Sequence, residues 1–183
     1  MPRKRTSSTP VAVATRASLL EFADSVTVTD APAQVAAAAP PLHLVTFVLD
    51  REEFGIPIGR VREVLRVGDI TRVPEAPPHI RGVTSVRGRI LPVVELRTRL
   101  GLAGLGEPDA RARIVVVEAH GRVLGLLVDA VNQVVNVPAD SVLAPPGEVL
   151  SAQTDYVTGI GRLDARLIIL LDLDRALLLA EAS

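Results

Sequence analysis

Three histidines, His43, His79 and His120, are the first residues of this 183-residue chain whose chemistry could serve a site. An imidazole binds metal ions or transfers a proton near neutral pH. A helical metal site commonly places two histidines four residues apart, and no two of these three have that spacing. The chain contains no cysteine, which excludes a disulfide, a thiolate zinc site and a cysteine nucleophile. We therefore expect no metal site.

The sequence offers no stronger candidates for a nucleophilic active site or for a phosphate-binding loop. Ser85, His79 and Asp129 can be combined on paper into a serine triad, but Ser85 does not lie in a Gly-x-Ser-x-Gly turn. The glycine-rich run 101–106 resembles a phosphate loop only loosely and does not open a long helix. The sequence therefore predicts a protein that is not an enzyme and that uses no cofactor.

Composition narrows the class of partner. Twenty basic residues face twenty-one acidic ones, for a net charge of -1, whereas nucleic-acid binders usually carry a basic excess. Aromatic residues make up 2% of the chain, too few for a base-stacking platform. A nucleic-acid-binding small barrel is thus the less favoured alternative, and we expect no nucleic acid as partner. No apolar run reaches the ~18 residues of a membrane helix. We expect a cytoplasmic protein without direct membrane insertion.

Two charged residues and several glycines are better candidates, for binding rather than catalysis. Glu63 lies between apolar neighbours just after an expected strand, and Arg87 shares a tight turn with Gly88. An outward guanidinium at such a tip suits a partner's carboxylate or carbonyl, although both charges could equally be solvated surface residues. Glycines in or beside strands indicate a bulge or a close backbone approach, with pure architecture as the alternative. These glycines are Gly55, Gly82, Gly125 and Gly159.

The elements that must position these residues are short strands. From Leu42 onward, Val, Ile and Leu runs alternate with turn signals, a pattern typical of an all-β barrel or sandwich. Helical spacing appears only in two short stretches, at 95–100 and 172–182. The expected strands cover residues 44–49, 54–58, 82–86, 89–94, 114–117, 123–128, 157–163 and 166–171.

The chain also contains an internal repeat. An offset of 70 residues places Val45 on Val115, and an offset of 77 places Gly82 on Gly159. The two blocks occur in the same order with the same turns, which indicates two similar β lobes. A seam between two lobes is a common place for a binding surface. The expected lobes are residues 42–105 and 106–180, with an exchange of strands between them left open.

Residues 1–41 differ from the rest of the chain. They are rich in Ala, Pro and Thr and show no sustained period, which favours a disordered N-terminal tail. Residues 16–24 could form two turns of amphipathic helix, either transiently or as a docking peptide.

The run Gly82-Val-Thr-Ser-Val-Arg-Gly-Arg-Ile-Leu-Pro-Val-Val-Glu-Leu96 resembles the Gly-Val-x-Asn-Leu-Arg-Gly-x-x-x-Pro-Val-Val-Asp-Leu signature of CheW-like domains. Three further motifs match in the same order: 61–64, 123–131, and 156–161 followed by 168–172. The resemblance runs from about Leu42 to Leu178 and leaves the first 41 residues uncovered. Departures are mild, with Ser-Val in place of Asn-Leu and Glu95 in place of Asp.

The resemblance implies two pseudo-symmetric five-stranded SH3-like β barrels, with short helices after residue 95 and at the C-terminus. It implies a chemotaxis adaptor that couples methyl-accepting receptors to the histidine kinase CheA. In such proteins the receptor tip lies in the groove between the barrels, and the kinase's regulatory domain pairs with barrel surfaces. By motif match, the first lobe would place Val61, Glu63, Gly82, Arg87 and Gly88 on or under partner-facing surfaces. Positions shaping the second lobe and the groove would be Gly125, Val131 and Gly159.

Overall fold

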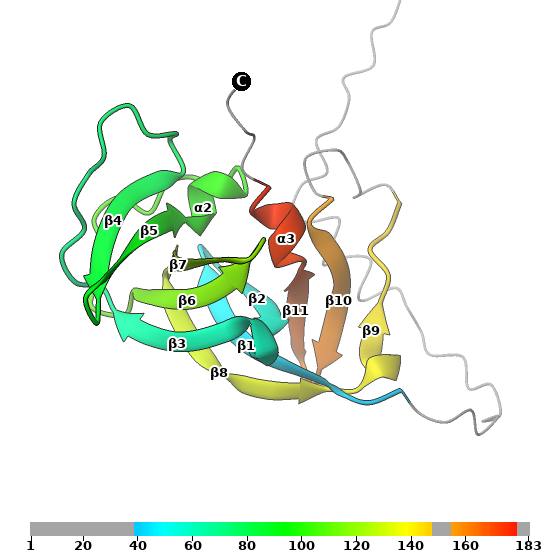
Figure 1. Ribbon diagram of the computed structural model, residues 1–183. Coiled ribbons are helices and arrows are strands. Elements are labelled where there is room, and N and C mark those ends of the chain that lie inside the picture. The colour runs from blue at the N-terminus through cyan, green and yellow to red at the C-terminus, as the bar shows by residue number, and fades with distance from the viewer. Residues whose placement is uncertain (1–38, 148–154, 179–183) are drawn as a thin grey trace, which may run out of the picture.

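The structure is a computed structural model that describes residues 39–147 and 155–178. Most of the expected tail, residues 1–38, and residues 179–182 of the second expected helix lie outside the described residues. Figure 1 shows two β-sheets side by side, with two short helices where the sheets meet. In chain order the elements are β1 (Leu42–Leu49), β2 (Glu52–Pro57), η1 (Ile58–Arg60), β3 (Val61–Arg66), β4 (Ile80–Val86), β5 (Arg89–Glu95), α2 (Leu96–Arg99), β6 (Arg113–Ala119), β7 (Arg122–Val128), β8 (Ala130–Val137), η2 (Ala139–Ser141), β9 (Val142–Leu143), β10 (Val157–Leu163), β11 (Arg166–Leu171) and α3 (Leu173–Ala176).

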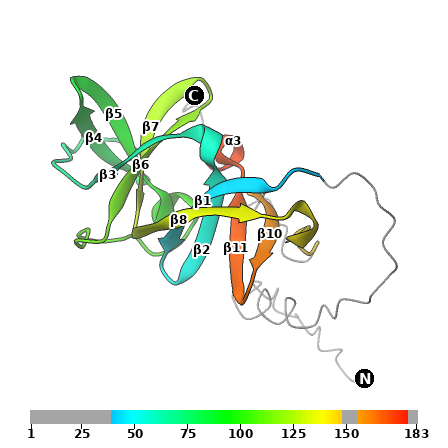
Figure 2. The same cartoon turned by 90° about the horizontal axis from the view of Figure 1, so that it is seen from below.

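Each sheet combines strands from both sequence halves. The six-stranded sheet has the order β8-β1-β2-β11-β10-β9, and the five-stranded sheet has the order β3-β6-β7-β5-β4. Figure 2 shows β1 and β2 lying with β8, β10 and β11, apart from β3 to β7. The expected lobe boundary near residue 105 therefore does not separate the two sheets. Strands β1 and β2 cross to the later strands, and β6 and β7 cross to the earlier ones.

The repeat persists in the strand register. Val45 pairs with Val134 across β1 and β8, and Val64 pairs with Val115 across β3 and β6. An offset of 70 residues converts one pair into the other. The two sheets therefore share one design, in which each repeat donates its first two strands to the sheet of its neighbour.

Tight turns with left-handed residues close the expected hairpins. Arg87 and Gly88 have φ values of 50° and 77°, and His120 and Gly121 have values of 50° and 68°. Positive φ at both central residues is the type I′ geometry, which matches the twist of the flanking strands. The hairpins β4–β5 and β6–β7 that these turns predict are both present. The third expected hairpin, β10–β11, is also present, and its turn has a positive φ of 53° at Asp164.

Three expectations about element extent are wrong. Residues 61–64 follow a strand, β2, but they form a strand of their own, β3, and β8 is likewise an additional strand. The second helix is shorter than expected, since α3 ends at Ala176 and Leu177 is its C-cap. Both missed strands follow the preceding strand closely: three residues separate β2 from β3, and Asp129 alone separates β7 from β8.

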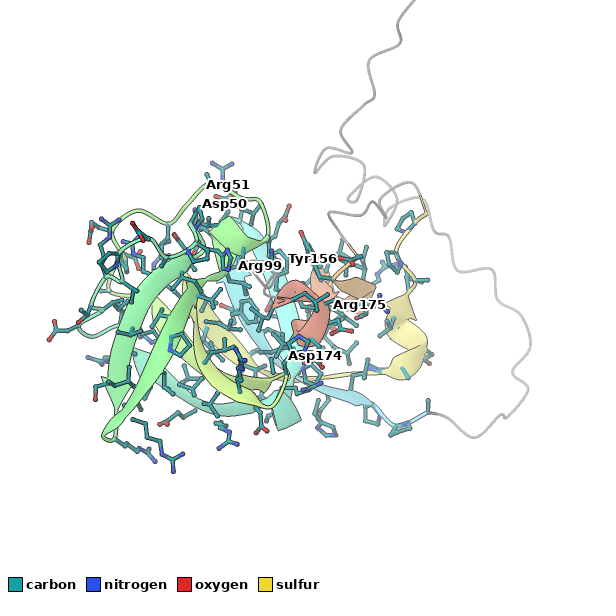
Figure 3. The ribbon with its side chains drawn as sticks, turned by 45° about the horizontal axis from the view of Figure 1, so that its top comes forward. Asp50, Arg51, Arg99, Tyr156, Asp174 and Arg175 are labelled. Carbon is teal, nitrogen blue, oxygen red and sulfur yellow. The ribbon has the colours of Figure 1, made fainter. Side chains whose placement is uncertain are left out.

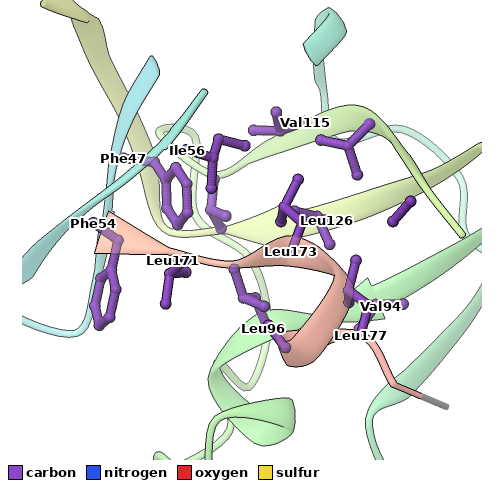
Figure 4. Close-up of a cluster of buried hydrophobic side chains, with 14 of the residues drawn as sticks. Phe47, Phe54, Ile56, Val94, Leu96, Val115, Leu126, Leu171, Leu173 and Leu177 are labelled. Carbon is purple, nitrogen blue, oxygen red and sulfur yellow. The ribbon is translucent and has the colours of Figure 1, made fainter. Parts of the chain in front are cut away.

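The seam between the sheets is filled by the largest apolar cluster (Figure 4). Phe47 and Phe54 stack there with ring centroids 6.2 Å apart, while Leu96 of α2 and Leu173 of α3 cover it from the helices. Two smaller clusters lie within the individual sheets, one around Ile168 and the other around Ile114. The two sheets are therefore held together by a shared core, and most of the seam is closed to partners.

No helix of the described residues is long and apolar enough to cross a membrane.

Candidate protein-interaction surface

Two of the expected partner-binding residues, Glu63 and Arg87, contact each other. Glu63 lies on β3 and Arg87 lies at the tip of the β4–β5 hairpin, and these strands are the two ends of the five-stranded sheet. The Arg87 Nη2 atom is 3.0 Å from the Glu63 Oε2 atom. The ion pair therefore shows that the sheet curls until its ends approach each other, as in a barrel.

The surface of this ion pair is accessible. The side chain of Arg87 is 81% exposed, whereas that of Glu63 is only 24% exposed. Ile90, on the same hairpin, is 74% exposed and pairs with Ser85. An exposed guanidinium next to an exposed aliphatic side chain is a composition favoured at protein interfaces. Gly88 permits the positive φ of this tip, and an added Cβ there would meet nothing within 4 Å.

Gly82 and Gly159 are buried at equivalent bulges and do not line an open groove. The register shifts between Ile80 and Gly82 in β4, and between Val157 and Gly159 in β10. A Cβ on Gly82 would lie 2.2 Å from the Thr71 carbonyl oxygen, and one on Gly159 would lie 2.9 Å from Val142 Cγ1. Gly82 thus lets the β3–β4 loop approach the sheet closely, and Gly159 does the same for strand β9.

Gly125, Val61 and Val131 are also enclosed, fully or partly, by other parts of the fold. Gly125 is buried in β7 of the five-stranded sheet, where an added Cβ would lie 2.6 Å from Ile114 Cγ2. Val61 and Val131 are partly buried and pack against the shared core. Of the eight expected residues, the structure brings together Glu63, Arg87 and Gly88 at one exposed place. The other five lie beneath the surface or within the sheets.

A partly buried ion pair that the motifs do not reveal joins α2 to two turns. Arg97 Nε donates to Asp129 Oδ1 at 2.8 Å, Arg97 Nη2 donates to Asp129 Oδ2, and the amide of Asp50 donates to Asp129 Oδ2 at 2.7 Å. The hydrogen bond to Asp129 raises the pKa of Arg97. Asp129 therefore does not meet Ser85 or His79 in a triad. A carboxylate directly after the apolar strand β7 is the signal that could have indicated it.

The two helices meet beside the shared core (Figure 3). Arg99 Nη2 donates to the Leu178 carbonyl at 2.5 Å, and the Tyr156 hydroxyl donates to the Leu100 carbonyl at 3.3 Å. Burial raises the pKa of Tyr156. These contacts link the α2 region to the segment after α3 and to the residue before β10, both of which adjoin the six-stranded sheet.

Histidines and carboxylates serve as structural contacts here. The His120 amide donates to Asp174 Oδ1 at 3.2 Å, and Arg60 Nη2 lies 2.5 Å from Asp174 Oδ2. These contacts, the backbone hydrogen bond first, lower the pKa of Asp174. Burial, and secondly the charge of Arg99, lowers the pKa of His79. Within residues 39–147 and 155–178, no group of three His, Asp or Glu side chains is placed to hold a metal ion.

Comparison with known proteins agrees with this architecture. The family model of the CheW-like domain matches residues 43–181. The chain is 34% identical to the chemotaxis protein CheW of Klebsiella aerogenes over 131 residues, covering 72% of this chain and 78% of that protein. It is 35% identical to the protein FrzA of Myxococcus xanthus over 114 residues, covering 62% and 71% of the two chains.

A solved structure has the same fold. The scaffolding protein TtCheW from Thermoanaerobacter tengcongensis superimposes with a TM-score of 0.70 and 34% identity, covering 78% of this chain and 96% of that one. These relatives are named as chemotaxis and scaffolding proteins, not as enzymes. The sequence motifs, the paired sheets and these similarities lead to one conclusion: the chain belongs to the CheW-like family of chemotaxis scaffold proteins.

Proposed function

We propose that this protein couples methyl-accepting chemotaxis receptors to the histidine kinase CheA, as a cytoplasmic adaptor recruited to membrane-associated receptor arrays. The observation that supports this most directly is the Glu63–Arg87 ion pair, with its exposed guanidinium next to exposed Ile90. These are two of the residues that the family motif assigns to partner contact, and they meet at one accessible place. In this proposal Glu63, Arg87 and Gly88 contact a partner, while Val61, Gly82, Gly125, Val131 and Gly159 maintain the shape of the surface.

The proposed mechanism is linkage without chemistry. An adaptor transmits a signal when its contacts with receptor and kinase differ in free energy between the active and inactive arrangements of the kinase. A coupling of about 1–3 kcal/mol changes an equilibrium by roughly 5- to 150-fold. A rigid body suits this role, and here the sheets are joined by the shared core and by the contacts of the α2 region with Tyr156 and Leu178.

The decisive test distinguishes two roles of Arg87: forming an ion pair within the protein, and contacting a partner directly. Arg87→Ala should abolish or strongly reduce receptor control of CheA in reconstituted arrays. Its melting temperature should fall by no more than about 4 °C, because an exposed ion pair contributes about 0.2–1 kcal/mol. Arg62→Ala is the matched control: Arg62 is the neighbour of Glu63 on β3 and also forms an exposed ion pair, with Glu118.

The charge-exchanged double variant Glu63→Arg/Arg87→Glu sharpens this test. If Arg87 contacts a partner, the exchange restores the ion pair and the stability but not the coupling. Full coupling by the exchanged variant would show that only the ion pair matters. Equal losses in Arg87→Ala and Arg62→Ala would contradict a partner surface at the hairpin tip.

A further inference from the structure

A solvent-open pocket of about 650 Å³ lies where β3 ends and β6 begins. The loop between β3 and β4, seen on the left of Figure 1, forms one wall, and the segment before β6 forms another. Four arginines line the pocket: Arg66, Arg72, Arg81 and Arg113. Neither Glu63 nor Arg87 is among its lining residues, so this is a second surface of the five-stranded sheet.

Two of these arginines face each other directly. Arg66 of β3 and Arg113 of β6 are cross-strand partners in the register of the sheet. Side chains of directly opposed residues point to the same face, with Cβ atoms about 5 Å apart, and like charges there are destabilising. The folded protein therefore carries an electrostatic cost at this position when nothing else is bound.

Carboxylates within the described chain do not neutralise this charge. Arg113 Nη1 donates to the carbonyls of Ala110 and Ala112 at 2.8 and 2.7 Å, which are uncharged acceptors. No side-chain carboxylate of residues 39–147 or 155–178 lies within ion-pair distance of Arg66, Arg72 or Arg113.

The fourth arginine has only long ion pairs. The guanidinium of Arg81 lies 3.9 Å from Glu95 and 3.8 Å from the fully exposed Glu107. Its shortest contact is a hydrogen bond to the Gly106 carbonyl, at 2.5 Å. Arg81 therefore also keeps part of its charge available to a bound anion.

The remaining lining residues restrict the kind of anion. Three carboxylates, those of Asp69, Glu107 and Asp109, lie on the same rim. Asp109 accepts hydrogen bonds from Arg111, and these lower its pKa, so that it stays charged. With four cations and three anions, the lining has a small net positive charge that one carboxylate balances, whereas the additional charges of a polyphosphate or nucleic acid would face the three carboxylates. Val67, Ile70 and Pro108 add an apolar part to the wall.

We infer that this pocket binds an acidic segment of a partner protein, in which an Asp or Glu carboxylate lies next to an aliphatic side chain. Guanidinium groups match carboxylates in fork geometry and form charge-assisted hydrogen bonds. The bound carboxylate neutralises the opposed Arg66 and Arg113, and the aliphatic side chain packs on Val67 and Ile70. This inference stands independently of the proposed function, because it holds for a partner of any signalling pathway.

The test is a titration of the full-length protein with an amidated peptide of sequence Gly-Glu-Leu-Asp-Leu-Glu-Gly. Binding is measured by NMR chemical-shift changes and by calorimetry. The same peptide with Gln and Asn in place of Glu and Asp is the uncharged control, and inorganic triphosphate is the competing anion. We expect the acidic peptide to bind at least about ten-fold more tightly than either, with an affinity that falls as salt rises. Arg66→Gln and Arg113→Gln should each weaken it about ten-fold, the equivalent of one charge-assisted contact. Arg162→Gln, on β10 of the other sheet, should have no effect.

A stability measurement distinguishes a binding role from a structural one. Because Arg66 and Arg113 repel each other, Arg66→Gln should leave the melting temperature of the free protein unchanged or raise it. A lower melting temperature with unchanged peptide binding would overturn the inference. Equal binding of the acidic and neutral peptides, absence of binding by both, or tighter binding of triphosphate would overturn it as well.

Discussion

The Arg97–Asp129 ion pair offers the most direct test of how the fold is held together. The two side chains are only 17% and 13% exposed, and their contact joins α2 to the corner between β7 and β8. Removing one partner of a buried ion pair costs about 3–5 kcal/mol, because the remaining charge loses its compensation. The residual exposure here favours the lower end, about 3 kcal/mol. At about 2–4 °C for each kcal/mol, Arg97→Met should lower the melting temperature by about 6–12 °C.

A double-mutant cycle measures the interaction itself. Asp129→Asn keeps an oxygen that can accept the hydrogen bond from the Asp50 amide but removes the charge that faces Arg97. Since both single variants remove the same interaction, the double variant Arg97→Met/Asp129→Asn should be more stable than additivity predicts, by about 2 kcal/mol.

Urea unfolding followed by circular dichroism gives the four free energies of unfolding. Arg111→Met is the control, because Arg111 forms an ion pair of ordinary length with Asp109 at the exposed surface. It should change the stability by less than about 0.5 kcal/mol. A coupling energy below about 0.5 kcal/mol between Arg97 and Asp129 would refute the reasoning, because the pair would then behave like an exposed one.

Two further predictions concern a glycine and an acidic residue. Gly159→Asp should lower the melting temperature by about 10 °C or more, because the new side chain would meet Val142 and Leu143 in a buried place. Gly59→Asp is the control and should not lower it, because Gly59 has open space around it. Equal melting temperatures of the two variants would contradict the close approach at Gly159. Contacts with His120 and Arg60 hold the folded-state pKa of Asp174 below 3.8, so the stability that it adds is present above that pH and is lost as pH falls through the folded-state pKa. Asp174→Asn should therefore melt below the wild type at about pH 6, and the two melting temperatures should converge as the pH falls through the folded-state pKa of Asp174. A gap independent of pH would refute the assignment.

The hairpins of this fold could be predicted because their turns are local. Arg87-Gly88 and His120-Gly121 combine a polar residue with glycine between apolar runs, and both adopt the left-handed geometry that such pairs favour. The repeat likewise indicated two similar sheets. The sequence pattern did not show which sheet the first two strands of each half join. Val64 and Val134, the alternative partners of Val45, are identical residues at equivalent positions. Either one could pair with Val45 on composition alone.

Chain geometry explains why the strands exchange. If β3 paired with β1 in its own half, it would run parallel to β2 in the same sheet. Two consecutive strands that run parallel in one sheet need a crossover connection of about a dozen residues, and only η1, Ile58–Arg60, connects β2 to β3. Between β7 and β8 only Asp129 intervenes. The short connections therefore send β3 and β8 into the opposite sheets, which would have been predictable had these segments been identified as strands.

The candidate surface was predictable residue by residue but not as an arrangement. Glu63 and Arg87 are charged residues at positions outside the expected apolar core, and the family motifs mark both residues as partner-facing. Their contact depends on the curling of the sheet, a property of the whole five strands. The arginine pocket was missed for a related reason: Arg66 and Arg113 are 47 positions apart and become neighbours only through the β3–β6 register.

The reciprocal exchange of strands makes this monomer equivalent to a domain-swapped homodimer whose two copies have been joined into one chain. Neither half contains a complete sheet, since β3 to β5 need β6 and β7, and β8 to β11 need β1 and β2. A half cut off in the loop at 101–112 would leave unpaired strand edges and an open core. No strand belongs to both sheets, but the two sheets share one apolar core, so the loss of either sheet exposes that core and destabilises the other. Two backbone connections, β2 to β3 through η1 and β7 to β8 through Asp129, carry a load applied to one sheet into the other without depending on a noncovalent hinge between them.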